Sequence, residues 1–168
     1  MNPLSEQQIR ASFVNASRRE AAQATLPDRA AVPWERLEHL GWRDRRSPAA
    51  AYVVLELADG PVGVLLRAST PAAGRTPRRA VCAWCHDITA TDATLYVARR
   101  AGADGRAGNT VGTLVCAEFT CSANVRRPPS SAEVGTDLES VREQFTRERT
   151  AGLRERSARF VEEVLRLR

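Results

Sequence analysis

The sequence predicts an α+β fold in which helices at both ends of the chain pack with a small antiparallel sheet. Apolar residues recur at helical spacing near both termini, and the middle of the chain contains two pairs of short segments rich in β-branched residues. Apolar residues make up 43% of the 168 residues, which is enough for one compact unit to bury a core. We expect a helical N-terminal region over residues 1–47, a central α/β region over 48–127, and a linker with a C-terminal helix over 128–168 that packs on the N-terminal helices.

The N-terminal region begins with a helix signal. Ser5 and Gln8 have the spacing of a capping box and start a helix predicted over about residues 5–24, where apolar residues recur at helical spacing. A second, shorter helix is predicted over residues 34–40, because apolar residues recur at intervals of three before the helix stop Gly41. With both segments helical, the sheet is left to the central region.

Two strand pairs are predicted in the central region. Residues 52–57 and 62–66 flank a turn that contains Gly and Pro, and they are predicted to form a β-hairpin. Residues 94–98 and 110–115 are predicted to form a second pair. The loop between them, residues 99–109, contains three glycines and three arginines, so we expect it to be mobile and positively charged.

Proline-containing segments mark two connections. Residues 69–79 have no apolar period and are predicted to be irregular, and residues 128–131 are predicted to be a linker. Beyond the linker, Thr136 and Glu139 have the spacing of a capping box and start a C-terminal helix with an apolar stripe. Residues 150–152 are a weak point in this stripe because Thr150 and Gly152 are poor helix formers, so the helix is expected to bend or break there.

The four cysteines are the strongest chemical signal in the sequence. Two residues separate Cys82 from Cys85, and four separate Cys116 from Cys121, so each pair can form one side of a tetrahedral site. The second predicted hairpin lies between the pairs and a short helix is expected at the second pair, which is the layout of a treble-clef zinc finger. We therefore predict one structural Zn²⁺ with four Cys ligands. Since four thiolates leave zinc no open position, and no nucleophile and base are patterned together elsewhere, we expect no enzymatic activity.

Other interpretations of the cysteines and histidines fit less well. Cys82, Cys85 and His86 also match the C-x-x-C-H motif of c-type haem attachment. The N-terminal residues of the sequence, however, lack the export signal that covalent haem attachment requires. That lack also leads us to expect a cytoplasmic protein. A redox or metal-sensing role for Cys82 and Cys85 leaves two cysteines unexplained. Because a fourth cysteine completes the ligand set, we expect His86 beside a ligand or at the surface, and His39 as a partly exposed helix residue.

The charge of the chain permits an acidic partner without requiring one. The net charge of +5 comes from 25 arginines against 20 acids, and residues 75–127 alone hold eight arginines and four acids. No apolar run approaches the roughly 18 residues that span a membrane. A basic zinc module suits an acidic protein or a nucleic acid such as ribosomal RNA. Trp84 lies between two ligands, where an aromatic ring can either shield the sulfurs or project outward as an interface anchor, and we favour the second interpretation. The candidate partner-binding residues are Trp84, Arg99, Arg100, Arg106, Arg126 and Arg127.

Several motifs together carry a family resemblance. They are Cys82-Ala83-Trp84-Cys85, the run Cys121-Ser122-Ala123-Asn124-Val125-Arg126 that follows Cys116, and residues 9–15 and 37–42. With them the sequence resembles, over nearly its whole length, the FBP-domain family. These are elongation-factor-G-binding proteins with a C-terminal treble-clef zinc finger, related to FusB-type fusidic-acid resistance proteins. The resistance proteins have a histidine where this chain has Cys116, which indicates a separate branch and leaves antibiotic resistance open.

The resemblance implies that the chain binds elongation factor G, the GTPase of translocation, and modulates its release from the ribosome. The leading hypothesis is therefore a monomeric, non-enzymatic zinc protein with elongation factor G as its partner. One alternative is a zinc module that binds ribosomal RNA, because arginines cluster near one end of a small sheet. The other is a thiol redox or metal sensor.

Overall fold

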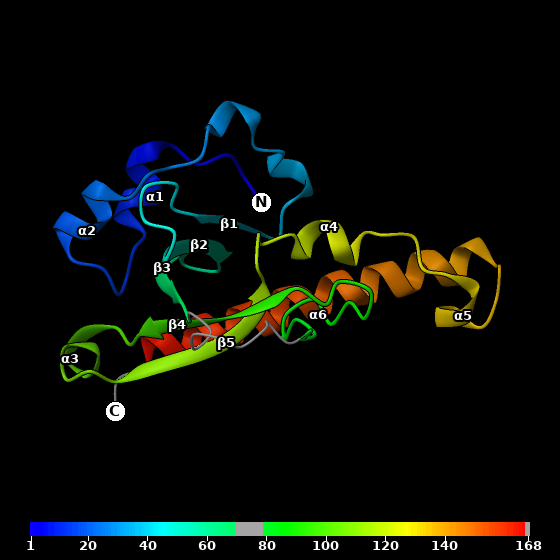
Figure 1. The fold of residues 1–168 in the computed structure, drawn as a ribbon. Coiled ribbons are helices and arrows are strands. Elements are labelled where there is room, and N and C mark those ends of the chain that lie inside the picture. Colours follow the sequence, from blue (N-terminus) through cyan, green and yellow to red (C-terminus); the bar gives the residue numbers. More distant parts are fainter. Residues whose placement is uncertain (70–78, 167–168) are drawn as a thin grey trace.

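The computed structural model describes residues 1–69 and 79–166 and shows an α+β architecture, as predicted (Figure 1). The sheet is antiparallel with strand order β1-β2-β3-β4-β5. Its strands are β1 (His39–Arg43), β2 (Ala50–Leu57), β3 (Gly60–Ala68), β4 (Ala93–Arg99) and β5 (Thr110–Cys116). The helices are α1 (Glu6–Ala11), α2 (Arg18–Gln23), α3 (Gly102–Arg106), α4 (Cys121–Val125), α5 (Ser131–Val134) and α6 (Glu139–Leu165), with 3₁₀ turns η1 (Arg29–Ala31) and η2 (Trp34–Arg36). Both predicted hairpins, β2–β3 and β4–β5, are confirmed.

Two separate cores form because the sheet is covered on both faces. Along β2, Tyr52 and Val54 pack with the N-terminal segment, whereas Val53 and Leu55 pack with α6 and the cysteines. Figure 1 shows α1 and α2 on one side of the sheet and α6 on the other. Burial on both faces explains why residues 50–55 are almost continuously apolar instead of alternating with polar residues.

The position of the C-terminal helix corrects one prediction. The expectation that it packs on the N-terminal helices is wrong, because the sheet lies between them. Helix α6 packs on α4 and on the face formed by β2, β3 and β5. Its buried side chains include Leu153, Phe160, Val161 and Val164, which share a core with the four cysteines. The apolar stripe of α6 therefore closes the core that surrounds the cysteines.

The N-terminal helix predicted from the sequence is instead two short helices. The capping box of Ser5 and Gln8 is present, but a second capping box, formed by Ser17 and Glu20, starts α2. Between the two helices the backbone exchanges two hydrogen bonds with Gly63 of β3, with N–O distances of 2.9 and 3.0 Å. This attachment to the sheet replaces helical hydrogen bonds, which local periodicity does not reveal.

The second predicted helix is also wrong. Only the turn η2 is helical, and the chain then continues as the edge strand β1, in which Gly41 pairs with Val53 of β2. Leu40 and Trp42 are buried in the N-terminal core, and the Trp42 ring stacks on Tyr52 with 5.0 Å between centroids. Alternate positions along a strand carry these contacts, so one strand of the sheet comes from the region predicted to be helical.

The C-terminal part also differs in detail. The predicted linker leads into α5, which begins with a capping box formed by Ser130 and Glu133. Helix α6 runs over 27 residues without the break expected at 150–152. A glycine in a helix costs only about 1 kcal/mol, less than the burial of Leu153 beside it contributes.

Two connecting segments complete the description. The loop predicted over 99–109 contains the short helix α3. Of the irregular connection predicted at 69–79, residues 70–78 lie outside the described part of the chain. Within that part, no helix combines the length and the apolar character needed to cross a membrane.

Candidate metal centre

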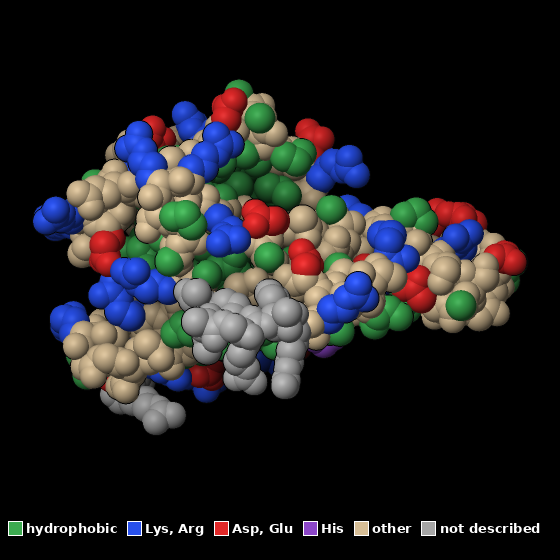
Figure 2. Space-filling model, in the orientation of Figure 1, with side chains coloured by type: hydrophobic (Ala, Val, Ile, Leu, Met, Phe, Trp, Pro, Cys, Tyr) green, Lys and Arg blue, Asp and Glu red, His purple; other side chains and the backbone are tan. Residues whose placement is uncertain are grey.

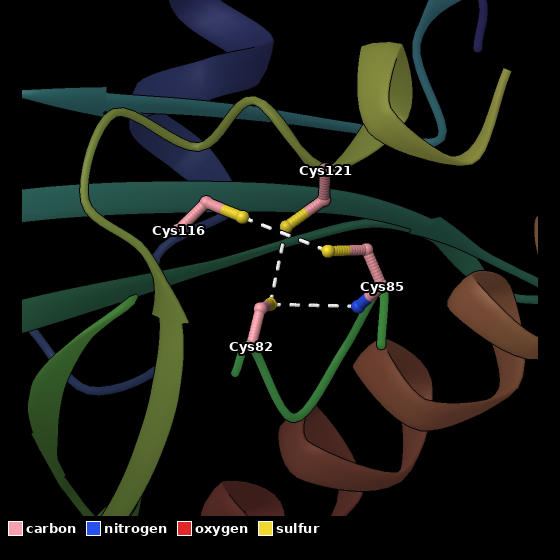
Figure 3. Close-up of side chains that lie close together, drawn as sticks. All are labelled: Cys82, Cys85, Cys116 and Cys121. Atoms are coloured by element: carbon pink, nitrogen blue, oxygen red, sulfur yellow. Dashed lines mark hydrogen bonds between the residues drawn. The ribbon is translucent and has the colours of Figure 1, made fainter. Parts of the chain in front are cut away.

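The structure brings the four predicted ligands together (Figure 3). Cys82 and Cys85 lie on the loop before β4, Cys116 is the last residue of β5, and Cys121 is the first residue of α4. The Sγ–Sγ distance is 3.6 Å both between Cys82 and Cys121 and between Cys85 and Cys116. All four Sγ atoms lie within 4.8 Å of one another, and each cysteine is at most 2% exposed.

This spacing fits a tetrahedral zinc ion. With Zn–S bonds of about 2.3 Å, neighbouring sulfurs of a tetrahedron stand about 3.8 Å apart, close to the distances found here. Four soft sulfur donors are the ligand set of structural zinc sites, and they fill every coordination position. The site therefore fits one structural zinc, which ties the loop before β4 to the end of β5 and to α4.

Backbone turns aim the sulfurs inward. In the described residues, His86 and Phe119 are the non-glycine residues with positive φ, at 53° and 55°, and each lies in the turn of one ligand pair. The His86 N–H donates to the Cys82 carbonyl at 3.1 Å, and the Phe119 N–H donates to the Cys116 carbonyl at 2.9 Å. Such left-handed positions persist where the surroundings hold them, as four sulfurs sharing a metal ion would. The His86 side chain is exposed and not part of the cluster, consistent with four Cys ligands.

Hydrogen bonds to the first pair of sulfurs, those of Cys82 and Cys85, favour their charged form. The backbone N–H groups of Trp84 and Cys85 donate to Cys82 Sγ at 3.3 and 3.4 Å. Hydrogen bonds from Cys116 and Cys121 lower the pKa of the Cys82 thiol and lower that of Cys85 to about 7. The hydrogen bonds within the cluster, together with burial, raise the pKa of the Cys116 and Cys121 thiols instead. Thiolate is the form that binds zinc, so Cys82 and Cys85 favour metal binding at neutral pH, whereas zinc has to displace the protons of Cys116 and Cys121.

Asn124 supports the site and was not among the predicted residues. Its Nδ2 lies 3.3 Å from Cys116 Sγ, so the amide donates to a ligand from one turn beyond Cys121 on α4. Its place three residues after the last cysteine is the one signal in the sequence that could have identified it. Donors of this kind disperse the net negative charge that four thiolates leave on a zinc site.

A family model supports the same site. A model described as the FBP C-terminal treble-clef zinc-finger matches residues 8–164. The chain belongs to this family. Neither the curated proteins nor the solved structures contain a match to the chain. The resemblance noted from the motifs is thus confirmed over nearly the whole chain, and the four cysteines are the metal site of an FBP treble clef.

In this FBP zinc finger, Trp84 points into the core. The side chain is 1% exposed, with the His39 ring edge-on at 5.2 Å between centroids and the Phe160 ring at 5.6 Å. Its backbone carbonyl accepts from Arg156 Nε at 2.7 Å. The expectation of an interface anchor is wrong, because α6 lies over the turn that carries Trp84.

His39 also differs from its prediction. It is 1% exposed in β1, not part of an open helix, and neither ring nitrogen has a hydrogen-bond partner within the described residues. Burial lowers the pKa of its imidazole to about 4, so the ring is neutral at pH 7. His39 therefore acts as a core side chain beside the zinc module.

Arg126 is used inside the molecule. Its guanidinium pairs with Glu38, whose side chain is 2% exposed, and Arg154 of α6 pairs with the same carboxylate. Burial alone raises the pKa of Glu38, but hydrogen bonds from Arg154 and Arg126 outweigh it and hold that pKa below its usual value. The backbone N–H of Glu38 donates to Ser122 Oγ at 3.0 Å, so this charge cluster joins the start of β1 to α4 and α6.

Arg127 is likewise committed to ion pairs. It contacts Asp87 at 3.3 Å and Glu133 at 2.8 Å, and Arg149 of α6 lies 3.8 Å from both carboxylates. Three donors from residues 89 and 90 also reach Asp87. The network joins the first cysteine turn to α5 and α6. The exposed basic patch expected at Arg126 and Arg127 is therefore absent, because buried carboxylates draw both side chains inward.

The three arginines around α3 have different environments. Arg100 donates to the Glu163 backbone and is 12% exposed. Arg99 is 45% exposed and pairs with Glu20 of α2 at 2.7 Å. Arg106 is exposed and forms no ion pair within the described residues. Of the five predicted partner-binding arginines, Arg99 and Arg106 thus keep an exposed side chain.

Proposed function

We propose that this FBP-family protein binds elongation factor G without catalysing a reaction and modulates the release of the factor from the ribosome. The observation that carries the proposal is the family match over residues 8–164. It agrees with the resemblance of the sequence motifs to those of elongation-factor-G-binding proteins. The structural zinc then stabilises the fold that presents the binding surface to the factor. A small sheet with a metal-stapled turn is rigid enough for that role.

The chemistry of the described residues supports a binding role. The four sulfurs are buried and would all be zinc ligands, which leaves no open position for water or substrate. In residues 1–69 and 79–166, neither histidine ring makes a hydrogen bond to a possible nucleophile, and His39 is shut inside the core. Burial of the sulfurs also weighs against the redox-sensor alternative, because thiol exchange needs access.

Exposed arginines suggest which surface faces the factor. In the described part of the chain, several exposed arginines form no ion pair, and most belong to the N-terminal half. Figure 2 shows basic side chains gathered over that half, around α1 and α2. Elongation factors are generally acidic, so such a surface would speed and orient association. We call these residues the basic surface: Arg18, Arg19, Arg29, Arg36, Arg45, Arg46, Arg67, Arg79 and Arg106.

Calorimetric titration of the zinc-loaded protein with its cognate elongation factor G tests the proposal. We expect saturable binding that weakens as salt rises, because exposed charges are screened. The double variant Arg45→Ala with Arg46→Ala should bind several-fold more weakly. Arg159→Ala, an exposed arginine paired with Glu155 on α6, is the control and should bind normally. Absence of binding by the wild-type protein would overturn the proposal.

Binding to ribosomal RNA is the second candidate function. The same unpaired arginines favour it, since phosphate contacts dominate nucleic-acid affinity. Titration with a ribosomal RNA fragment at several salt concentrations distinguishes the two. RNA binding predicts a steep linear fall of log affinity with log salt, and RNA affinity above that for the factor would favour this second function.

A further inference from the structure

The N-terminal part of α6 carries apolar side chains that the fold leaves uncovered. The stripe that is buried from Leu153 onward begins with Leu138, Val141 and Phe145. Leu138 is 64% exposed and Val141 is 39% exposed, whereas Leu153 is fully buried. Figure 1 shows the reason: α5 and the first turns of α6 extend beyond the sheet as a protruding arm. We call residues 131–148 the arm.

The arm borders a groove beside the zinc module. The groove has a volume of about 680 Å³ and lies between the loop after Cys85 and the helices α5 and α6. Ile88, which is 67% exposed, and Phe145 provide its apolar lining, together with Ala132. Val141 lies one helical turn before Phe145 and continues this apolar surface along α6. Exposed apolar side chains that cluster in this way mark an interaction surface.

The charge of the arm is opposite to that of the remaining chain. The arm has five carboxylates and two arginines, whereas the other residues hold 23 arginines and 15 acids. Glu148 lines the groove, is exposed, and accepts from Gln144 at 2.8 Å without an arginine partner in the described residues. Asp137 at the start of the arm is exposed and accepts from Ser131. Within the described part of the chain, Glu148 and Asp137 thus offer carboxylates without an arginine partner. The arginines that line the groove are engaged within the chain, because Arg149 pairs with Asp87 and Glu133 and Arg156 donates to the Trp84 carbonyl.

We propose that the arm is a docking site for a basic amphipathic segment of a partner protein. Apolar side chains of that segment would fill the groove between Ile88 and Phe145, and its Lys or Arg side chains would lie beside Glu148 and Asp137. The charge complementarity is the reverse of that of the basic surface, so this is a second, separate partner site. The acidic arm repels nucleic acid and anionic lipid, which selects a protein segment as its occupant.

A designed peptide provides the test. The probe is a fluorescein-labelled helical peptide of leucine and lysine, about 18 residues or five turns long, with leucine at i, i+3, i+4 and i+7. Anisotropy should show saturable binding to the zinc-loaded full chain, and amide NMR shifts should fall on Ile88 and the arm. A leucine and glutamate peptide of the same pattern should not bind. Glu148→Gln should reduce the salt dependence of binding.

Substitutions on the apolar stripe distinguish binding in the groove from nonspecific hydrophobic binding of the peptide. Val141→Ser and Leu138→Ser should each weaken binding by about tenfold, as expected when an interface anchor is lost. Leu114→Ser on β5 is the matched control, because Leu114 is 37% exposed and does not line the groove. All three side chains are exposed, so the melting temperature and zinc content of each variant should stay near the wild type.

Three outcomes would overturn the inference. They are no saturable binding up to about 1 mM peptide, equal affinity of the stripe variants and the Leu114→Ser control, or amide shifts that lie outside the arm and the loop around Ile88. Sedimentation velocity adds a further test. If the protein self-associates and Val141→Ser abolishes this, the groove belongs to a second copy of the chain and the proposed partner is wrong.

Discussion

Gly41 offers the sharpest test of how the sheet supports the zinc module. A Cβ added at this position in β1 would lie 2.5 to 2.6 Å from the Cβ, Cγ and Cδ1 atoms of Phe119. Phe119 is 6% exposed, has a left-handed backbone, and lies between the ligands Cys116 and Cys121. Its ring also contacts Tyr96 at 5.1 Å between centroids, so it has little room to withdraw. Gly41→Ala should therefore displace the second ligand turn.

The expected magnitude follows from two opposing effects. Overpacking a filled core costs about 1–3 kcal/mol. Replacing glycine by alanine stiffens the unfolded chain, which contributes about 0.4–1 kcal/mol of stability. The net loss is then about 1–2 kcal/mol, or about 2–8 °C in melting temperature for a chain of this length. Zinc release should also become faster, because the displaced ring lies inside the C-x₄-C turn.

Thermal melts of the zinc-loaded proteins, followed by circular dichroism, measure the first effect, and a chromophoric chelator measures zinc release. Gly112→Ala is the matched control, since it also lies in a strand and its added Cβ would meet nothing closer than Leu95 Cδ1 at 3.4 Å. This control should be as stable as the wild type or slightly more stable. A Gly41→Ala protein that melts and releases zinc like the Gly112→Ala protein would refute the reasoning.

Three further predictions concern the core around the metal. Chelation, or the substitution Cys121→Ser, should remove the zinc, because each ligand is needed to complete the site. The remaining thiols should become accessible together with loss of near-ultraviolet circular dichroism, since structural zinc contributes directly to folding. Stepwise thiol labelling of a protein that stays folded would contradict this. The folded pKa of His39, about 4 against an ordinary 6.5, means that the unfolded chain binds more protons between these values. Stability should therefore fall by up to about 3 kcal/mol as the pH drops from 6.5 to 4. At saturating zinc, denaturant titrations should show this dependence reduced in His39→Phe, and equal slopes in both proteins would count against it. Trp84→Ala should lower the free energy of unfolding by about 3–5 kcal/mol in chemical denaturation, because the side chain is buried. The folded fraction should still bind elongation factor G. A loss of binding without a loss of stability would instead identify Trp84 as an interface residue.

The sequence alone determined the metal chemistry and much of the local structure. Ligand spacing depends on a few neighbouring residues, so Cys82, Cys85, Cys116 and Cys121 could be identified as a zinc set before any contact was known. The hairpins and the first capping box are also short-range features, and both are present. Family membership extends the same local signals over nearly the whole chain.

Only the tertiary structure decided which side chains are available to a partner. The sequence placed Trp84, Arg126 and Arg127 at the surface because they flank ligands. In the fold, α6 from the far end of the chain covers Trp84, and the buried carboxylates of Glu38 and Asp87 pair with Arg126 and Arg127. Strand β1 likewise exists because its hydrogen bonds go to β2, although its apolar spacing also suits a helix. Periodicity reports what a segment can form, whereas burial and charge pairing depend on contacts between distant segments, which no local pattern encodes.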